Sequence, residues 1–174
     1  MKSGGKGANK AGAPRLPMPE ILTKYFGSIE YTDADVVQFS SGLPAFEDET
    51  QFLLIEPPSR APLVFLQSVR ESSLCFLTLP ILIVDPEYHL SIAAEDLASL
   101  GLNSSQPWPI GEEITCLAVI AVTESGRITA NLLAPVVINR GERLGLQAIR
   151  VDATYSHEHP VTQVSSGRKE DVCS

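Results

Sequence analysis

The longest regular alternation of apolar and polar positions lies between residues 128 and 139. Ile128, Ala130 and Leu132 occupy every second position, which is the spacing of a β-strand with one buried face. Pro135 interrupts this pattern, and the apolar run 136–138 follows it. Because proline has no N–H group for a sheet ladder, we expect either a bulge at Pro135 or the point at which one strand becomes another.

Shorter apolar runs recur along the chain, separated by Gly, Pro and Asp residues, which is typical of an antiparallel sheet or barrel. The first two runs should form a hairpin about Gly27, and the last should pair with 136–138 through a turn. The predicted strands lie at residues 21–26, 29–31, 36–39, 52–55, 63–68, 74–78, 114–122, 127–131 and 144–151. The sequence therefore predicts a mostly β fold, an antiparallel β-barrel-like single domain with one or two short helices.

The best helix candidate is the segment 93–100. Glu95 and Asp96 stand in its first turn, where they complement the helix dipole, and Gly101 is placed as its C-cap.

Two aromatic residues lie in predicted loops. Residues 40–48 should form a turn that tucks Phe46 into the core. Trp108, the only tryptophan, either anchors its loop in the core or is an exposed contact residue.

The length of 174 residues fits one globular domain with additional tails. Composition divides the chain into a disordered basic N-terminal tail (1–19), a β domain (20–160) and a disordered C-terminal tail (161–174). Met18 stands where the β domain begins. We hypothesise that translation starts there, which the intact mass of the native protein would decide.

Charge is distributed unevenly between these parts. Residues 1–19 contain four basic side chains and no acidic one, whereas residues 20–160 contain 19 acidic and 7 basic side chains, a net charge of −12. Such a domain repels nucleic acid and attracts basic partners. The sequence therefore predicts no direct binding of nucleic acid.

Membrane, secreted and metal-binding classes are disfavoured. No apolar run reaches the roughly 18 residues needed to span a bilayer, and no apolar stretch follows the N-terminal basic residues, so a cytoplasmic protein is expected. The three cysteines form no CxxC pair, and Cys75 and Cys116 lie in apolar runs as core residues. His157 and His159 alone would not close a metal site. No cofactor is predicted.

Acidic side chains are the main candidates for chemistry. No nucleophile elbow, phosphate-binding loop or HExxH motif is present. Paired carboxylates can serve acid–base catalysis, can form a solvated face or can dock a basic protein. They occur at Glu47-Asp48-Glu49, Asp85 with Glu87, Glu95-Asp96 and Glu112-Glu113. A binding protein is predicted rather than an enzyme.

Five short motifs occur in one order along the chain. They are Gly42-Leu43-Pro44-Ala45-Phe46-Glu47-Asp48, Phe65-Leu66-Gln67-Ser68, Glu95-Asp96-Leu97 with Leu100-Gly101-Leu102, Asn131 to Asn139, and Gly145-Leu146-Gln147 with Tyr155-Ser156 and His159-Pro160. Together they resemble the FliW family of bacterial flagellar assembly factors. Residues 79–87 depart from the family pattern, because the Asp expected before Pro80 and the aromatic residues expected after it are missing.

The resemblance implies a small β-barrel-like cytoplasmic protein that binds flagellin and the translational regulator CsrA in a partner switch. Free FliW-like protein sequesters CsrA, which otherwise represses flagellin mRNA, and accumulating flagellin releases CsrA again. Two alternatives remain open: a small carboxylate-dependent hydrolase, and a generic acidic mimic of nucleic acid. The candidate partner-binding residues are Glu47, Asp48, Glu49, Glu95, Asp96, Asn131, Leu132 and Pro135.

Overall fold

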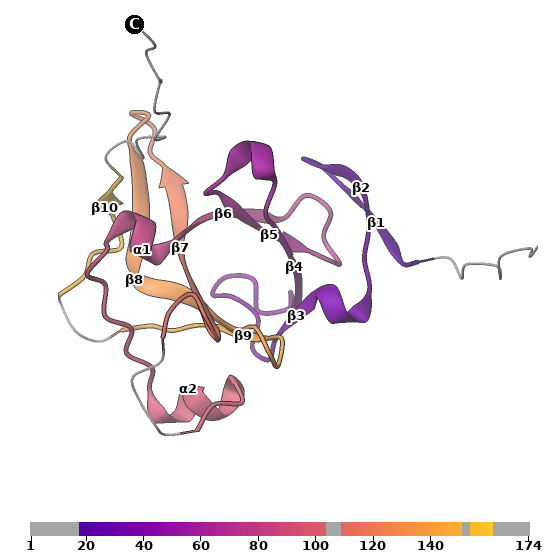
Figure 1. Cartoon of the computed structure of the whole chain (residues 1–174). Coiled ribbons are helices and arrows are strands. Elements are labelled where there is room, and N and C mark those ends of the chain that lie inside the picture. Colours follow the sequence, from indigo (N-terminus) through magenta and orange to yellow (C-terminus); the bar gives the residue numbers. More distant parts are fainter. Residues whose placement is uncertain (1–17, 104–108, 151–153, 162–174) are drawn as a thin grey trace, which may run out of the picture.

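Ten strands and two short α-helices form the structure, a computed structural model that describes residues 18–103, 109–150 and 154–161. Eight strands make one sheet that curves into a ring, while the other two form a separate hairpin beside it (Figure 1). The strands are β1 Glu20–Thr23, β2 Gly27–Glu30, β3 Val36–Phe39, β4 Gln51–Ile55, β5 Val64–Ser68, β6 Cys75–Pro80, β7 Ile114–Val122, β8 Ile128–Asn139, β9 Leu144–Gln147 and β10 His159–Pro160.

Strands β3 to β9 close into a seven-stranded barrel. Neighbours from β3 to β8 pair in antiparallel fashion, and β9 pairs with the second half of β8. The other edge of β9 pairs in parallel with β3, where Phe39 is opposite Gly145. A side chain at Gly145 would overlap the Phe39 ring, since an added Cβ would lie 2.6 Å from Cζ. The sheet therefore closes only because this position has no side chain.

β8 contains the bulge expected near Pro135. Opposite β7, the register shifts by three residues between the pairs Leu117↔Val136 and Val119↔Asn131. The first half of β8 pairs with β7 and the short β10, and the second half with β7 and β9. The bulge lets one continuous strand belong to both the barrel and the hairpin that extends above it (Figure 1).

Buried side chains form two clusters on opposite faces of the same sheet. Phe39, Phe52 and Leu117 belong to the cluster inside the barrel. Neighbouring Cys116 and Ala118 belong to the second cluster. Two helices and their linker cover this second cluster, α1 Ile81–Val84 and α2 Ala94–Ser99. The alternation read from the sequence therefore separates two cores rather than a core from solvent.

The fold class, the hairpin about Gly27 and the helix before Gly101 are confirmed. One local prediction is wrong: Phe46 is 39% exposed, and it packs edge-on against Phe76, with ring centroids 5.2 Å apart. The predicted strand 74–78 is longer than expected, because β6 extends to Pro80 and continues directly into α1.

Trp108 and both tails lie outside the described residues, apart from Met18, Pro19 and Val161. The predicted domain boundaries stay predictions.

Candidate functional site

Two acidic segments distant in sequence meet beside β9. The loop between β3 and β4 contributes Glu47, and helix α2 contributes Asp96; both line a shallow depression of about 250 Å³. Gly42 and Gln147 also line it, and no basic side chain does. Barrel closure therefore joins two of the four predicted acidic clusters.

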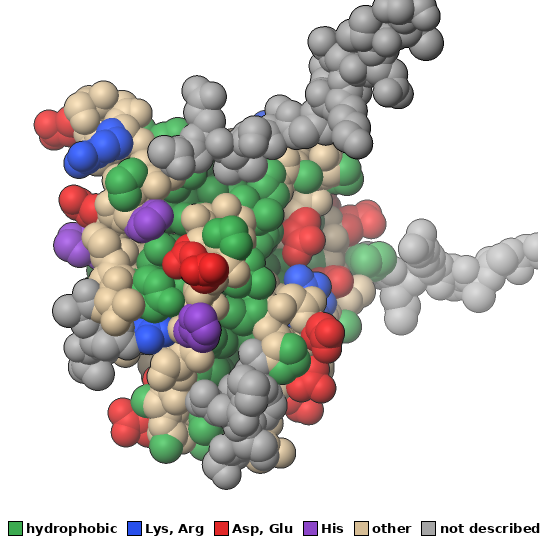
Figure 2. Space-filling view, turned by 60° about the vertical axis from the view of Figure 1, so that its left-hand side comes forward, with side chains coloured by type: hydrophobic (Ala, Val, Ile, Leu, Met, Phe, Trp, Pro, Cys, Tyr) green, Lys and Arg blue, Asp and Glu red, His purple; other side chains and the backbone are tan. Residues whose placement is uncertain are grey.

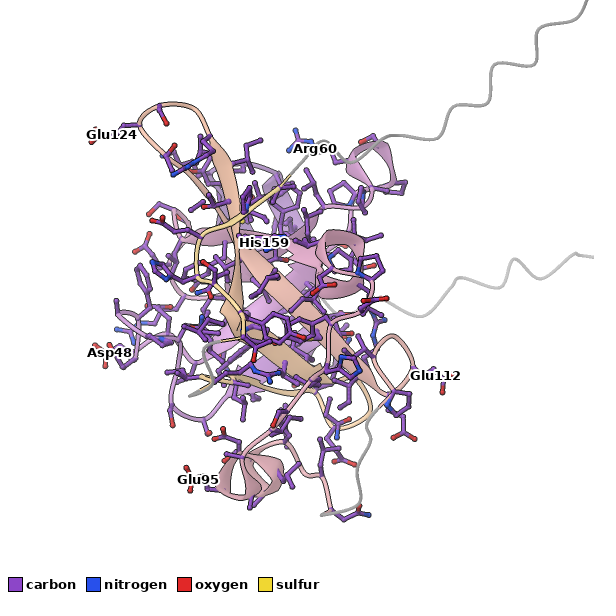
Figure 3. The ribbon with its side chains drawn as sticks, turned by 90° about the vertical axis from the view of Figure 1, so that its left-hand side faces the viewer. Asp48, Arg60, Glu95, Glu112, Glu124 and His159 are labelled. Carbon is purple, nitrogen blue, oxygen red and sulfur yellow. The ribbon has the colours of Figure 1, made fainter. Side chains whose placement is uncertain are left out.

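Asp48 and Glu95 extend this acidic region. Both side chains are exposed and project from the same side of the molecule, whereas Glu112 lies at the opposite edge (Figure 3). Glu49 has a different environment, because its Oε2 accepts a hydrogen bond of 2.6 Å from Ser68 Oγ. We call Glu47, Asp48, Glu95 and Asp96 the acidic docking surface.

The backbone of the β3–β4 loop holds Glu47 in place. Gly42 has φ +65°, and an added Cβ would lie 2.6 Å from the carbonyl oxygens of Phe46 and Glu47. Ala45 also has a positive φ, of 70°, and its N–H donates to Glu47 Oε1 at 3.0 Å. The Gly42–Asp48 motif is thus a tight turn that fixes one carboxylate and exposes the next.

Of the three motif residues of β8, Leu132 and Pro135 are buried and Asn131 is half-buried. Leu132 is 1% exposed in the second core cluster, and Pro135 is buried. Asn131 Oδ1 accepts hydrogen bonds from the N–H groups of Leu133 and Ala134, at 3.1 and 2.9 Å. These bonds satisfy backbone donors within the bulge. Leu132 and Pro135 therefore present little surface to a partner, whereas part of Asn131 is accessible.

Three larger hollows lie elsewhere on the molecule. One, of about 340 Å³, has walls formed largely by prolines and by Ile81, Leu82 and Ile110. Another, of about 480 Å³, is a groove between the β1–β2 hairpin and β4. The third, of about 520 Å³, is lined by Glu112, Glu113 and Arg140 among others. Hydrophobic side chains also occupy the centre of the face shown in Figure 2, between separate groups of acidic ones. These hollows could not be predicted from the sequence, because each is built from segments distant in the chain.

The described residues offer little reactive chemistry. No group of three or more His, Cys, Asp or Glu side chains among them could hold a metal ion. Burial raises the pKa of the Cys75 thiol to about 11 and that of Cys116 to about 12, so both remain protonated at neutral pH. The acidic docking surface is open and shallow, unlike the water-excluding cleft that carboxylate catalysis needs.

Two further motif residues have structural roles that sequence reasoning missed. The Gln67 side chain is fully buried, and its Nε2 lies 3.0–3.4 Å from four carbonyl oxygens of the β5–β6 turn. Asn139 Nδ2 donates to Leu100 O at 2.9 Å, which ties β8 to the end of α2. A buried polar residue inside an apolar strand was the available signal for both.

In the described part of the chain, no helix has the length and apolar character needed to cross a membrane.

Comparisons with known proteins agree with this architecture. The model of the family described as FliW protein matches residues 20–161. The flagellar assembly factor FliW of Syntrophomonas wolfei is 31% identical over 152 residues, 87% of this chain and 94% of that protein. That of a Geobacillus strain is 33% identical over 141 residues, 80% and 93% of the two chains. The crystal structure of a flagellar assembly factor FliW matches with a TM-score of 0.73 at 31% identity, covering 83% of this chain and 98% of that one.

Proposed function

This chain belongs to the FliW family of flagellar assembly factors, and we propose that it works in the cytoplasm as a switch between two protein partners, flagellin and the translational regulator CsrA. When flagellin is scarce, the free protein binds CsrA and relieves its repression of flagellin mRNA. When flagellin accumulates, it occupies the protein and CsrA is released. The activity is binding, without a catalytic step.

The observation that carries the CsrA half is the acidic docking surface. Carboxylates from the β3–β4 loop and from α2 converge there without a basic side chain in the depression between them. A basic protein surface is the complementary partner, because opposite potentials steer encounter and stabilise the complex. CsrA, which binds RNA through basic surfaces, has the required charge.

Inhibition of CsrA follows from the charge of the docked domain. Residues 20–160 have a net charge of −12, which would raise the electrostatic cost of bringing RNA phosphates close. The protein need not cover the RNA site itself. By linkage, RNA must weaken binding of this protein to CsrA by the same factor.

For flagellin, the supporting feature is apolar. The hollow of about 340 Å³ is lined mostly by apolar side chains, including the exposed Leu82 of α1, and the next residue, Ile83, is also exposed. An apolar anchor in such a hollow is the usual core of a protein–protein contact. We assign flagellin binding to this region, away from the acidic docking surface.

Charge reversal tests the acidic docking surface. The double substitution Asp48→Lys with Glu95→Lys should weaken CsrA binding about 10-fold or more and reduce its salt dependence, because both exposed carboxylates face the partner. Calorimetry at two salt concentrations measures both effects, and flagellin affinity should stay unchanged.

The matched control is Glu112→Lys with Glu113→Lys, which changes the net charge equally but outside the acidic docking surface, with Glu112 at the opposite edge in Figure 3. Equal loss in both variants would mean that net charge alone matters, as for a generic acidic mimic of nucleic acid. Unchanged CsrA affinity in the first variant, with the fold retained, would remove this surface from the mechanism.

A further inference from the structure

A groove of about 480 Å³ separates the β1–β2 hairpin from the barrel wall. Phe26 and Ile29 of the hairpin and Leu54 of β4 give it apolar walls. Glu30 and Glu56 add carboxylates to the lining. This combination suits an extended segment that has apolar and basic side chains side by side.

The hairpin beside this groove places two like charges directly opposite each other. Glu20 pairs with Glu30 in the β1–β2 register, and neither forms an ion pair with any described residue. Like charges directly opposite on paired strands destabilise the pair. Two nearby cations are already engaged, since Arg143 Nε donates to Ala34 O at 2.6 Å and Arg140 lies 3.9 Å from Glu56. Arg143 also lines the groove, together with the carboxylates of Glu30, Asp35 and Glu56, so the lining has more acidic than basic side chains.

The chain enters β1 beside this groove. Tyr31, which lines the groove, donates its N–H to Pro19 O at 3.0 Å. The preceding residues 1–17 contain Lys2, Lys6, Lys10 and Arg15 and no acidic side chain.

Pro14 and Pro17 flank the dipeptide Arg15-Leu16. Prolines at this spacing favour the extended polyproline conformation that aromatic grooves recognise.

We propose that residues 1–17 bind in the groove of the same molecule, with Leu16 against its apolar wall and Arg15 and Lys10 beside Glu20 and Glu30. Arg15 is only five residues from Glu20, and an extended chain spans roughly 3.3–3.6 Å per residue. Because the segment is tethered, its high effective concentration compensates for weak individual contacts. The docked segment neutralises part of the domain's negative charge and blocks the groove to other basic segments. This inference does not depend on the proposed function.

Amide chemical shifts of the ¹⁵N-labelled full chain test the proposal without any partner. In the tail variant, Lys6→Ser, Lys10→Ser and Arg15→Ser together remove most of the positive charge. Amides of Phe26, Ile29 and Leu54 should differ between this variant and the wild type. Raising the salt concentration from about 20 to about 500 mM should move the same amides in the wild type and leave them unmoved in the variant, because screening releases the segment.

Two single variants locate the contact. Glu30→Gln should reproduce the shift changes of the tail variant at Phe26 and Leu54, whereas Glu124→Gln at the tip of the β7–β8 hairpin should not. The wild-type shifts should be independent of protein concentration, as expected for binding within one molecule.

Four results would overturn the proposal. The first is that the tail variant changes shifts only within residues 1–19, and the second is that the changes appear at Asp48 and Glu95 instead. The third is a shift that disappears on dilution, which would identify a second copy as the occupant. The fourth is an intact mass showing that the native protein begins at Met18, because the occupant would then be missing.

Discussion

At the residue scale, Gly42 and Gln67 of the family-like motifs both have roles within the fold. Gly42 combines a positive φ with backbone oxygens where a Cβ would lie. The buried side-chain amide of Gln67 lies within hydrogen-bond distance of four carbonyl oxygens of the β5–β6 turn. Gly42 therefore controls the position of the loop that carries Glu47, and Gln67 that of the β5–β6 turn.

Gly42→Ala should lower the free energy of unfolding by roughly 2–4 kcal/mol, because the new Cβ overlaps backbone atoms that cannot move away easily. The matched control is Gly126→Ala, which has a similar φ of +77° but nothing within 4 Å of the added atom. That variant should lose only about 1 kcal/mol, the cost of the backbone conformation. Urea denaturation measures both, and equal losses would show that the Gly42 turn relaxes freely.

Gln67→Leu should cost about 1–3 kcal/mol of stability, since it removes the hydrogen bonds from Nε2 to the β5–β6 turn. The carbonyl groups of Glu71, Ser72 and Leu74 keep their backbone N–H donors, which limits the loss. Gln147→Leu offers the comparison, because its partly buried Nε2 makes a single hydrogen bond of 2.7 Å to Ala134 O. A loss of about 1 kcal/mol is expected there. If thermal unfolding ranks the two variants in the opposite order, the role assigned to the Gln67 amide is wrong.

At the scale of elements, strands with clear alternation could be predicted from the sequence. The β3–β9 pairing could not, because both strands have four residues and lie about a hundred residues apart in the chain. The run Ile81–Val84 is β-branched and strand-like, yet it forms α1 immediately after Pro80. Tertiary packing of Ile81 into the second core cluster outweighs its local preference.

The candidate site, like the fold, could be predicted from the sequence only in part. Exposed acidic clusters could be identified from the sequence, but their convergence beside β9 depends on barrel closure. Asn131, Leu132 and Pro135 were selected through the resemblance to the family. The sequence alone does not distinguish a family motif that builds a strand from one that contacts a partner.

The β8 bulge gives a prediction at this scale. Asn131→Ala should cost about 1–2 kcal/mol, because the N–H groups of Leu133 and Ala134 lose their acceptor. Asn131→Asp retains an oxygen at the same position and should cost less. Denaturation of the two variants checks this ranking, and CsrA and flagellin affinities should follow the folded fraction alone. Loss of affinity in a fully folded Asn131→Ala protein would instead give this residue a direct binding role.

At the scale of the whole molecule, the two proposed partner-binding surfaces lie apart from each other. The acidic docking surface lies beside β9 and α2, whereas the apolar hollow lies between α1 and the loop after β4. If the partners bind these separate surfaces, mutual exclusion requires either overlap of the bound proteins or a coupling free energy between the sites. A coupling of about 1–3 kcal/mol would give a 5- to 150-fold change in affinity.

The most direct test of the partner switch is competition calorimetry with the full chain. Flagellin from the same genome is titrated into the preformed complex with CsrA, at two salt concentrations. We expect flagellin to displace CsrA, and we expect higher salt to weaken the CsrA complex more than the flagellin complex. A stable complex of all three proteins, with each affinity unchanged by the other partner, would contradict the switch.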